Sequence, residues 1–184
     1  MKKNKAIFLD RDGIVNIEKD YVYRIDDFVF IDGVFDACLA LNQAGYKIII
    51  MTNQAGIGRG YYTETDFFNL TNWMLGEFKK KSIIIEDVYF CPHHAVHGKG
   101  KYLTTCECRK PKPGMIIKAS VEHKLDLENS FLAGDKLTDI QAGQAAGIGQ
   151  NFFVRTGKSI PDEHCTLADG VFNTLPDVVN FISR

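Results

Sequence analysis

Short apolar, strand-like runs alternate with amphipathic, helix-like segments along the whole of this 184-residue chain. Residues 46–51, YKIIIM, are rich in β-branched side chains and have the length of a buried central strand. Such alternation indicates βαβ units, in which a helix connects two parallel strands. We therefore predict one domain, residues 1–184, with a Rossmann-like, doubly wound α/β fold. It would have a mainly parallel sheet, helices on both faces and no separate cap domain.

Apolar periodicity and helix-ending residues place the individual elements. Strands are expected over residues 7–9, 46–51, 83–90, 131–133, 152–154 and 171–172, and helices over 33–44, 63–78, 115–124, 139–146 and 176–182. Residues 18–30 have no clear period and are expected to form a flap or hairpin over the first strand. The glycine-rich segment 52–60 is similar in kind to phosphate-cradling loops but lacks the G-x-x-x-x-G-K-[ST] pattern.

Composition limits the possible partners. The hydrophobic fraction of 45% and the charged fraction of 24% are ordinary for a soluble globular protein. A net charge of −1 gives no reason to expect nucleic acid or an acidic membrane as a partner. Apolar runs are too short for a membrane span or a signal peptide, so we expect a cytoplasmic protein, and a monomer.

Two carboxylates follow the first expected strand directly. Asp10 and Asp12 come after the apolar run 7–9, and Gly13 follows them. Ligands of open α/β sheets bind at the carboxyl ends of the strands. Two carboxylates on one face repel each other, and a divalent cation between them makes the arrangement favourable. A surface turn is the alternative interpretation, because Asp-Gly pairs are common in turns.

Later strand ends carry matching polar groups. Thr52 ends the second expected strand, Lys110 lies in a long loop after the third, and Asp135 ends the fourth. Three carboxylates, a hydroxyl and a lysine in one crevice suit a divalent metal and a phosphoryl group. Mg²⁺ prefers carboxylates, water and phosphate oxygens as ligands, and a carboxylate can act as a nucleophile toward phosphorus. These residues favour Mg²⁺-dependent phosphoryl transfer.

The motifs resemble those of the haloacid dehalogenase superfamily of phosphatases. They are D-x-D-G at residues 10–13, the strand-end Thr52, Lys110, and G-D-x-x-x-D at 134–139. The segments IFLDRDGIVN, TNQAGIGRG, CPHH…CECRKPKPGM and GDKLTDIQAG carry the resemblance over nearly the whole chain. Ile14 is a departure, since the family usually has a threonine at this supporting position.

The resemblance implies roles for three aspartates at the metal. Asp10 would attack phosphorus and bind Mg²⁺, and Asp135 would be a further metal ligand. Asp12 would protonate the leaving oxygen, then activate water, and would bind the metal through its backbone carbonyl. A general acid needs a pKa above the aqueous value of about 3.9. The Asp10 carboxylate would raise the pKa of Asp12 and Mg²⁺ would lower it, and the sequence leaves the outcome open.

The remaining implied roles concern the phosphoryl group and the substrate. Thr52 and Lys110 would hold the transferring phosphoryl, and Asp139 would orient Asp135 and its neighbours. Substrate contacts are implied for Glu18, Lys19, Asp20, Tyr21, Asn53, Gln54, Ala55, Arg109 and Lys136.

The implied substrate is a small phosphorylated sugar. The resemblance points to release of the C7 phosphate of a heptose 1,7-bisphosphate, on the way to activated heptose for surface polysaccharide. The same chemistry on histidinol phosphate or another small phosphate ester is the nearer alternative. A non-enzymatic zinc-stabilised binding module is an alternative of another class, and the complete set of catalytic residues argues against it.

Four residues have the spacing of a second metal site. Cys91-x-His93 and Cys106-x-Cys108 offer one nitrogen and three sulfurs, which is a ligand set of closed structural zinc sites. Free thiols or a cramped Cys106–Cys108 disulfide are the alternatives. With the resemblance added, we expect a structural Zn²⁺ in a loop insertion of about residues 91–110 that delivers Lys110. His94 and His97 compete with His93 for the nitrogen position, and the family pattern favours His93.

Overall fold

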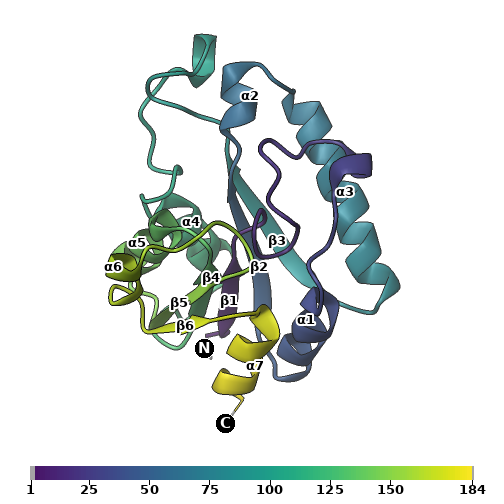
Figure 1. Cartoon of the computed structure of the whole chain (residues 1–184), viewed down its shortest axis with the longest axis vertical. Coiled ribbons are helices and arrows are strands. Elements are labelled where there is room, and N and C mark those ends of the chain that lie inside the picture. Colours follow the sequence, from purple (N-terminus) through teal and green to yellow (C-terminus); the bar gives the residue numbers. More distant parts are fainter. Residues whose placement is uncertain (1–2, 184) are drawn as a thin grey trace.

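The computed structural model describes residues 3–183 and contains one six-stranded sheet in which every pair of neighbouring strands is parallel (Figure 1). The strand order is β3-β2-β1-β4-β5-β6. The chain therefore builds outward from β1 in one direction and then returns to place β4 on the other side of β1. Such a reversal leaves a crevice at the carboxyl ends of the central strands. The strands are β1 (Ala6–Leu9), β2 (Lys47–Asn53), β3 (Ile85–Cys91), β4 (Phe131–Gly134), β5 (Gln150–Val154) and β6 (Gly170–Phe172).

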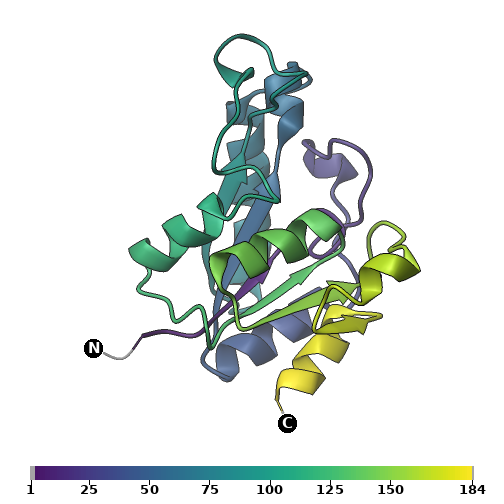
Figure 2. The same ribbon diagram turned by 90° about the vertical axis from the view of Figure 1, so that its left-hand side faces the viewer.

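Helices cover both faces of this sheet (Figures 1 and 2). Buried side chains of α1 (Val34–Gln43), α3 (Glu64–Lys80) and α7 (Leu175–Ile182) share one core cluster with Ile7 and Leu9 of β1. Side chains of α4 (Gly114–Glu122) and α5 (Leu137–Ala146) share the other with Phe8. Alternate residues of β1 thus point to opposite cores, as the strand period requires. The predicted doubly wound parallel sheet is confirmed.

Helix boundaries follow the predicted chemistry. The Thr63 side chain accepts a hydrogen bond from the Asp66 backbone, and the Asp66 carboxylate bonds back to the Thr63 backbone, which completes the capping box of α3. Gly45 has a φ of 83° just beyond α1, a conformation that side chains disfavour. The predicted apolar face of α1 is buried at Val34, Ala37, Cys38 and Leu41.

Four short elements were not predicted: α2 (Ala55–Arg59), α6 (Asp162–Cys165) and the 3₁₀ turns Ile25–Asp27 and Gly100–Tyr102. Each is too short to show a period in the sequence. The glycine-rich segment after β2 is therefore a short helix and not an open loop. A Cβ on Gly56 would lie 2.2 Å from the Tyr62 ring, and one on Gly58 would lie 2.5 Å from the Pro92 carbonyl oxygen. These glycines allow α2 to pack closely.

Two connections rise above the carboxyl ends of the strands. Residues 18–30 form the expected flap, closed at its base by the backbone bond from Ile17 N to Val29 O (2.8 Å). Residues 92–113, between β3 and α4, form a long loop that extends beyond the sheet, away from both marked chain ends (Figures 1 and 2). Lys99 N donates to Gly58 O of α2 (2.8 Å), which ties this loop to the rest of the fold. Within residues 3–183, no helix has the length and apolar character needed to cross a membrane.

Candidate active site

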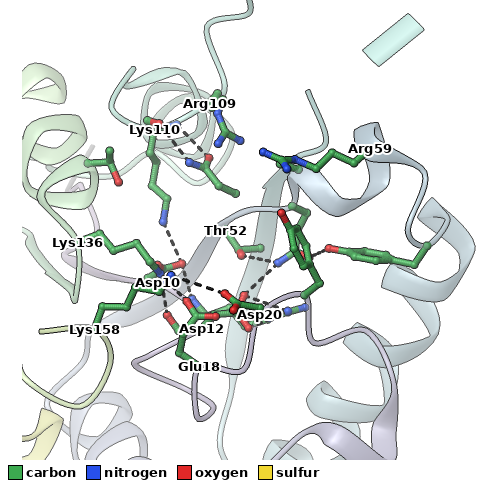
Figure 3. A pocket seen from close by; sticks show the side chains of 17 residues that line it. Asp10, Asp12, Glu18, Asp20, Thr52, Arg59, Arg109, Lys110, Lys136 and Lys158 are labelled. Carbon is green, nitrogen blue, oxygen red and sulfur yellow. Dashed lines mark hydrogen bonds and ion pairs between the residues drawn. The ribbon is translucent and has the colours of Figure 1, made fainter. Parts of the chain in front are cut away.

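The strand ends and the connections that follow them bring most of the predicted residues to one pocket of about 350 Å³ (Figure 3). Leu9 pairs with Ile50 on one side and Ala133 on the other, so Asp10 emerges between the ends of β2 and β4. Thr52 is the penultimate residue of β2, and Lys110 reaches in from the long loop. This volume falls in the range of small-molecule sites.

A buried lysine joins two of the carboxylates. Lys110 Nζ lies 2.9 Å from Asp10 Oδ1 and 2.6 Å from Asp139 Oδ1, and it donates to Met51 O at 3.1 Å. All three side chains are almost fully buried. Burial alone would lower the pKa of Lys110, but the two carboxylates raise it, so the ammonium stays charged. Asp139 thus orients Lys110, and it also accepts from the Lys136 backbone at 3.0 Å.

Asp10 has a strongly perturbed acidity. Its burial, with contributions from neighbouring Asp139 and Asp135, raises the pKa of Asp10 to about 7 despite the two lysines beside it. Burial likewise raises the pKa of Asp135. Three buried carboxylates therefore share two ammonium groups. A divalent cation would favour the ionised form of each.

Asp12 is held by three neighbours. Its carboxylate accepts from Arg11 Nη2 (2.9 and 3.0 Å), from Asn16 Nδ2 (3.0 Å) and from Gln54 Nε2 (3.2 Å). Burial by itself would raise the pKa of Asp12, but the charge and hydrogen bonds of Arg11, helped by Asn16, lower it below its ordinary value. The Arg11 guanidinium, which the sequence argument did not consider, is therefore the main influence that lowers the pKa of Asp12.

Gln54 is fixed by a buried tyrosine. Its amide nitrogen donates to Thr52 Oγ1 (2.7 Å) as well as to Asp12, and its amide oxygen accepts from the Tyr62 hydroxyl. Gln54 is 2% exposed and Tyr62 6% exposed. The Asp12 carboxylate can only accept, so it faces the amide nitrogen, and the Tyr62 hydroxyl holds the amide oxygen on the opposite side. Tyr62 in turn stacks on Tyr23 of the flap, with ring centroids 4.9 Å apart.

The donor set at Asp10 fits a magnesium ion. The Asp10 and Asp135 carboxylates and the Asp12 backbone carbonyl face one point, where the Lys136 ammonium contacts all three. These are oxygen ligands, which Mg²⁺ prefers. A cation, the ammonium, already contacts this set, so the surroundings suit positive charge.

Two glycines make room for Asp135. A Cβ at Gly13 would lie 2.5 Å from Asp135 Oδ2, and one at Gly157 would lie 2.0 Å from the same atom. Gly13 also has a φ of 96°. The Lys158 backbone N donates to Asp135 Oδ2 at 3.0 Å. The glycine of the D-x-D-G motif is thus required by the close approach of the third carboxylate.

Most of the expected substrate contacts line the pocket. They are Glu18, Asp20, Tyr21, Asn53, Gln54, Ala55, Arg109 and Lys136. Lys19 is not among the lining residues, because its side chain turns to the flap backbone and lies 3.4 Å from Asp27 O. Asp135 lies beneath the pocket, fully buried.

Sequence reasoning missed Arg11, Arg59, Tyr62, Thr138 and Lys158, which also line the pocket. Arg11 occupies the variable position of D-x-D-G, and its exposure of 1% could not be read from the motif. Arg59 lies in the TNQAGIGRG segment. Its position beside glycines after a strand was the only feature of the sequence that could have suggested a place in the pocket.

Two arginines form the basic end of the pocket. In Figure 3, Arg59 and Arg109 point toward the same region, away from Asp10 and Asp12. Among residues 3–183, neither forms an ion pair with a carboxylate, whereas Arg109 Nη1 donates to His93 O at 3.3 Å. Two unpaired guanidinium groups in one pocket favour an anion between them.

The long loop gathers the four predicted zinc ligands. Cys91 Sγ lies 3.0 Å from Cys108 Sγ and 3.5 Å from Cys106 Sγ, and His93 Nδ1 lies 3.4 Å from Cys108 Sγ. Sulfurs bound to one tetrahedral zinc would be about 3.8 Å apart. The hydrogen bond between the Cys91 and Cys108 side chains lowers the pKa of Cys108 to about 5, which favours the thiolate that binds metal. These residues fit a structural zinc ion.

The alternatives for this loop are less well supported. The five cysteines are free, so the Cys106–Cys108 disulfide is not formed. His94 Nδ1 accepts from the backbone N of Val96 and His97 inside a turn, and the group of metal-binding side chains includes His93 instead.

Ile14, the departure from the family pattern, is fully buried in the core shared with α1.

Comparison with known proteins gives consistent matches. Residues 107–178 match the family model described as HAD-hydrolase-like. The chain is 45% identical over 179 residues to a D-glycero-beta-D-manno-heptose-1,7-bisphosphate 7-phosphatase of Vibrio cholerae, covering 97% of this chain and 96% of that protein. It is 46% identical to a D-glycero-alpha-D-manno-heptose-1,7-bisphosphate 7-phosphatase of Burkholderia mallei, with coverages of 98% of this chain and 95% of that protein.

A solved structure shares the architecture. The D,D-heptose 1,7-bisphosphate phosphatase of B. bronchiseptica, complexed with magnesium and phosphate, superimposes with a TM-score of 0.82. It is 28% identical, and the match covers 97% of this chain and 98% of that one.

Proposed function

Because the chain belongs to the HAD-like hydrolases and is a phosphoric monoester hydrolase, we propose that its substrate is D-glycero-D-manno-heptose 1,7-bisphosphate. The enzyme would release the C7 phosphate as a step toward ADP- or GDP-heptose, precursors of lipopolysaccharide. Relatives named for this activity are matched over nearly their full length. The proposal covers the whole chain as one catalytic domain.

The observation that carries the proposal is the division of the pocket into two ends. Asp10 and Lys110 lie at one end, where a phosphoryl group would be transferred. Arg59 and Arg109 line the other end and have no carboxylate partner within residues 3–183. A sugar with a phosphate on each side would satisfy both ends. Histidinol phosphate would leave the two arginines without an anion.

The chain's own residues suit an aspartyl-phosphate mechanism. The Asp10 carboxylate would attack phosphorus, so that an acyl phosphate forms as the bond to the sugar oxygen breaks. The Lys110 ammonium, 2.9 Å from Asp10, would neutralise charge on the transferring group, and Thr52 would donate its hydroxyl proton to it. Water would then attack the phosphorus and regenerate Asp10.

Asp12 would serve both steps as acid and base. Arg11, Asn16 and Gln54 hold its carboxylate in one place and favour its ionised form. The ionised carboxylate is the form needed to take a proton from the attacking water. For the first step it must carry a proton, and the negative charge of a bound phosphate ester would raise its pKa.

Two metals complete the proposal. Mg²⁺, held by Asp10, Asp135 and the Asp12 carbonyl, would supply positive charge that stabilises the transferring phosphoryl. Zn²⁺ would be structural, because Cys91, His93, Cys106 and Cys108 fill its four positions. Arg109 and Lys110 follow Cys108 directly, so the zinc would fix the segment that reaches the pocket.

The test is phosphate release from both anomers of the bisphosphate, with histidinol phosphate and p-nitrophenyl phosphate as comparisons. Both anomers are needed, since the similar proteins are named for one or the other. We expect Mg²⁺-dependent release with a kcat/KM at least about 100-fold higher for one heptose bisphosphate than for histidinol phosphate. Metal content is measured on the same sample and should include one zinc. A preference for histidinol phosphate would contradict the substrate assignment.

The same assay tests the basic end. Arg59→Gln should lower kcat/KM for the bisphosphate about tenfold or more and leave p-nitrophenyl phosphate unaffected within twofold. Arg155→Gln is the matched control, because Arg155 does not line the pocket. Equal losses on both substrates would contradict the assignment of Arg59 to a second phosphate.

A further inference from the structure

The Lys136 ammonium contacts four oxygens of the site. It lies 3.0 Å from Glu18 Oε2, 3.2 Å from Asp135 Oδ1, 3.6 Å from Asp10 Oδ2 and 3.5 Å from the Asp12 backbone oxygen. In Figure 3 the Lys136 side chain extends toward Asp10 and Glu18. Burial alone would lower the pKa of Lys136, but the charges of Asp10, Asp135 and Glu18 raise this pKa. The Lys136 side chain therefore carries a positive charge.

Three of these four contacts are the donors proposed for magnesium. They are the carboxylates of Asp10 and Asp135 and the carbonyl of Asp12. Magnesium binds oxygens at about 2.0–2.1 Å and requires nearly octahedral geometry. An ammonium in contact with the same three oxygens would occupy that space and repel the ion. The two cations therefore compete for one set of donors.

The fourth contact offers the ammonium another position. Glu18 belongs to the flap and makes the shortest of the four contacts. The Lys136 side chain is 32% exposed, whereas Lys110, on the opposite side of Asp10, is 2% exposed. Lys136 can thus move toward Glu18 and the open pocket without leaving a charge unpaired, while Lys110 has no such freedom.

We propose that Lys136 is a resident counter-cation of the metal site, and that a divalent cation binds by displacing its ammonium onto Glu18. The inference rests on the magnesium site in the proposed function. Lys136 neutralises the buried carboxylates of the metal-free protein, and metal binding carries the cost of moving it. Glu18 reduces that cost because it keeps a partner for the displaced charge. Displacement also leaves the ammonium facing the pocket, where it can contact a phosphate.

The experiment is calorimetric titration of Mg²⁺ alone into the protein that retains its zinc but has been freed of magnesium. Lys136→Met should bind Mg²⁺ at least tenfold more tightly than the wild type, because no ammonium has to leave. Glu18→Gln should bind it at least threefold more weakly, because the displaced ammonium loses its partner. Adding Glu18→Gln to Lys136→Met should change the Mg²⁺ affinity by less than twofold. In that background there is no Lys136 ammonium for Glu18 to pair with.

The control is Lys158→Met. Lys158 also lines the pocket, but its ammonium pairs with Asp20 at 3.7 Å and makes none of the four contacts described above. Its loss should change Mg²⁺ affinity by less than twofold. An equal gain in Lys136→Met and Lys158→Met would mean a general effect of pocket charge and would overturn the displacement.

The remaining outcomes are also decisive. Unchanged or weaker Mg²⁺ binding in Lys136→Met would overturn the proposal, and Lys136→Gln gives the same test if the methionine variant is poorly folded. A Glu18→Gln effect that persists in the double variant would mean direct attraction of the ion and would overturn the role of Glu18. Absence of Mg²⁺ binding in the wild type would instead contradict the proposed function.

Discussion

The carboxylate centre and the cysteine cluster are both candidate metal sites, but they are built in opposite ways. The carboxylate centre joins residues from separate strand ends, and two lysines contact its carboxylates: Lys110 and Lys136. The cysteine cluster comes from the end of β3 and a single loop. Within the described residues, its side-chain hydrogen bonds run only among its own four members.

Because of this difference, we expect the carboxylate centre to need a metal for catalysis and the cysteine cluster to need one for local folding. The carboxylate centre rests on the parallel sheet and contains its own positive charges, so its framework does not depend on an added ion. The cysteine loop spans more than twenty residues with one short 3₁₀ turn, so the metal would supply much of its order. We expect loss of magnesium to stop catalysis without unfolding, and loss of zinc to unfold the loop.

The largest expected effect is at the carboxylate centre. Asp10→Asn should lower Mg²⁺-dependent phosphate release by at least about 10³-fold, because it removes the nucleophile. Phosphate release and circular dichroism measure activity and folding in parallel. The fold should be retained, since Lys110 keeps its contact with Asp139. Activity within tenfold of the wild type would exclude the aspartyl-phosphate mechanism.

The next effect concerns the cysteine cluster. Cys106→Ala should raise KM about tenfold or more and change kcat less, because the loop that carries Arg109 and Lys110 loses its metal. Steady-state kinetics and hydrogen exchange of residues 92–113 are the measurements. Cys165→Ala is the control, since Cys165 lies outside the cluster. An unchanged KM with a collapsed kcat would show that the cluster acts on chemistry and not on binding.

A smaller effect is expected from a residue that contacts the carboxylate centre only through Gln54. Tyr62→Phe should lower kcat about fivefold and leave KM within twofold, because the Gln54 amide loses the bond that orients it toward Asp12. Tyr23→Phe is the matched control, because Tyr23 stacks on Tyr62 but does not bond to Gln54. Equal effects of the two changes would point to flap packing instead.

The smallest effect is on stability and depends on pH. Burial raises the pKa of Asp10 from 3.8 to about 7. Between these values the folded protein keeps a proton that the unfolded chain has lost, so this group makes stability fall as pH rises, by at most about 1.4 kcal/mol per pH unit. Without metal, the Tm of Asp10→Asn relative to the wild type should therefore rise from pH 4.5 to 7 and level off above.

Differential scanning calorimetry measures this difference, with the Asp66→Asn variant as a control for an exposed capping carboxylate whose pKa is lowered. That control should show a Tm difference that stays constant from pH 4.5 to 7, because its stabilisation is fully present above the unfolded pKa of 3.8 and is lost only at more acid pH. A Tm difference for Asp10→Asn that is constant with pH would contradict the raised pKa.

Much of the fold could be predicted because its signals are local. Period-2 and period-3.6 patterns and capping residues placed all six strands and the five longer helices within a few residues. The expectation for residues 52–60 was less accurate, because α2 is too short to have a period. Lys19 shows the same limit: its neighbours Glu18 and Asp20 line the pocket, but the turn of the flap directs Lys19 elsewhere.

The sequence by itself determined the parallel sheet and the residue types at its strand ends, since apolar periodicity, glycines and carboxylates are properties of neighbouring positions. Only the tertiary structure decided what each carboxylate contacts. Arg11 lowers the pKa of Asp12, burial raises that of Asp10, and Lys136 reaches the donors proposed for the metal. Burial and charge pairing depend on distances between segments far apart in the chain, and no local pattern records those distances.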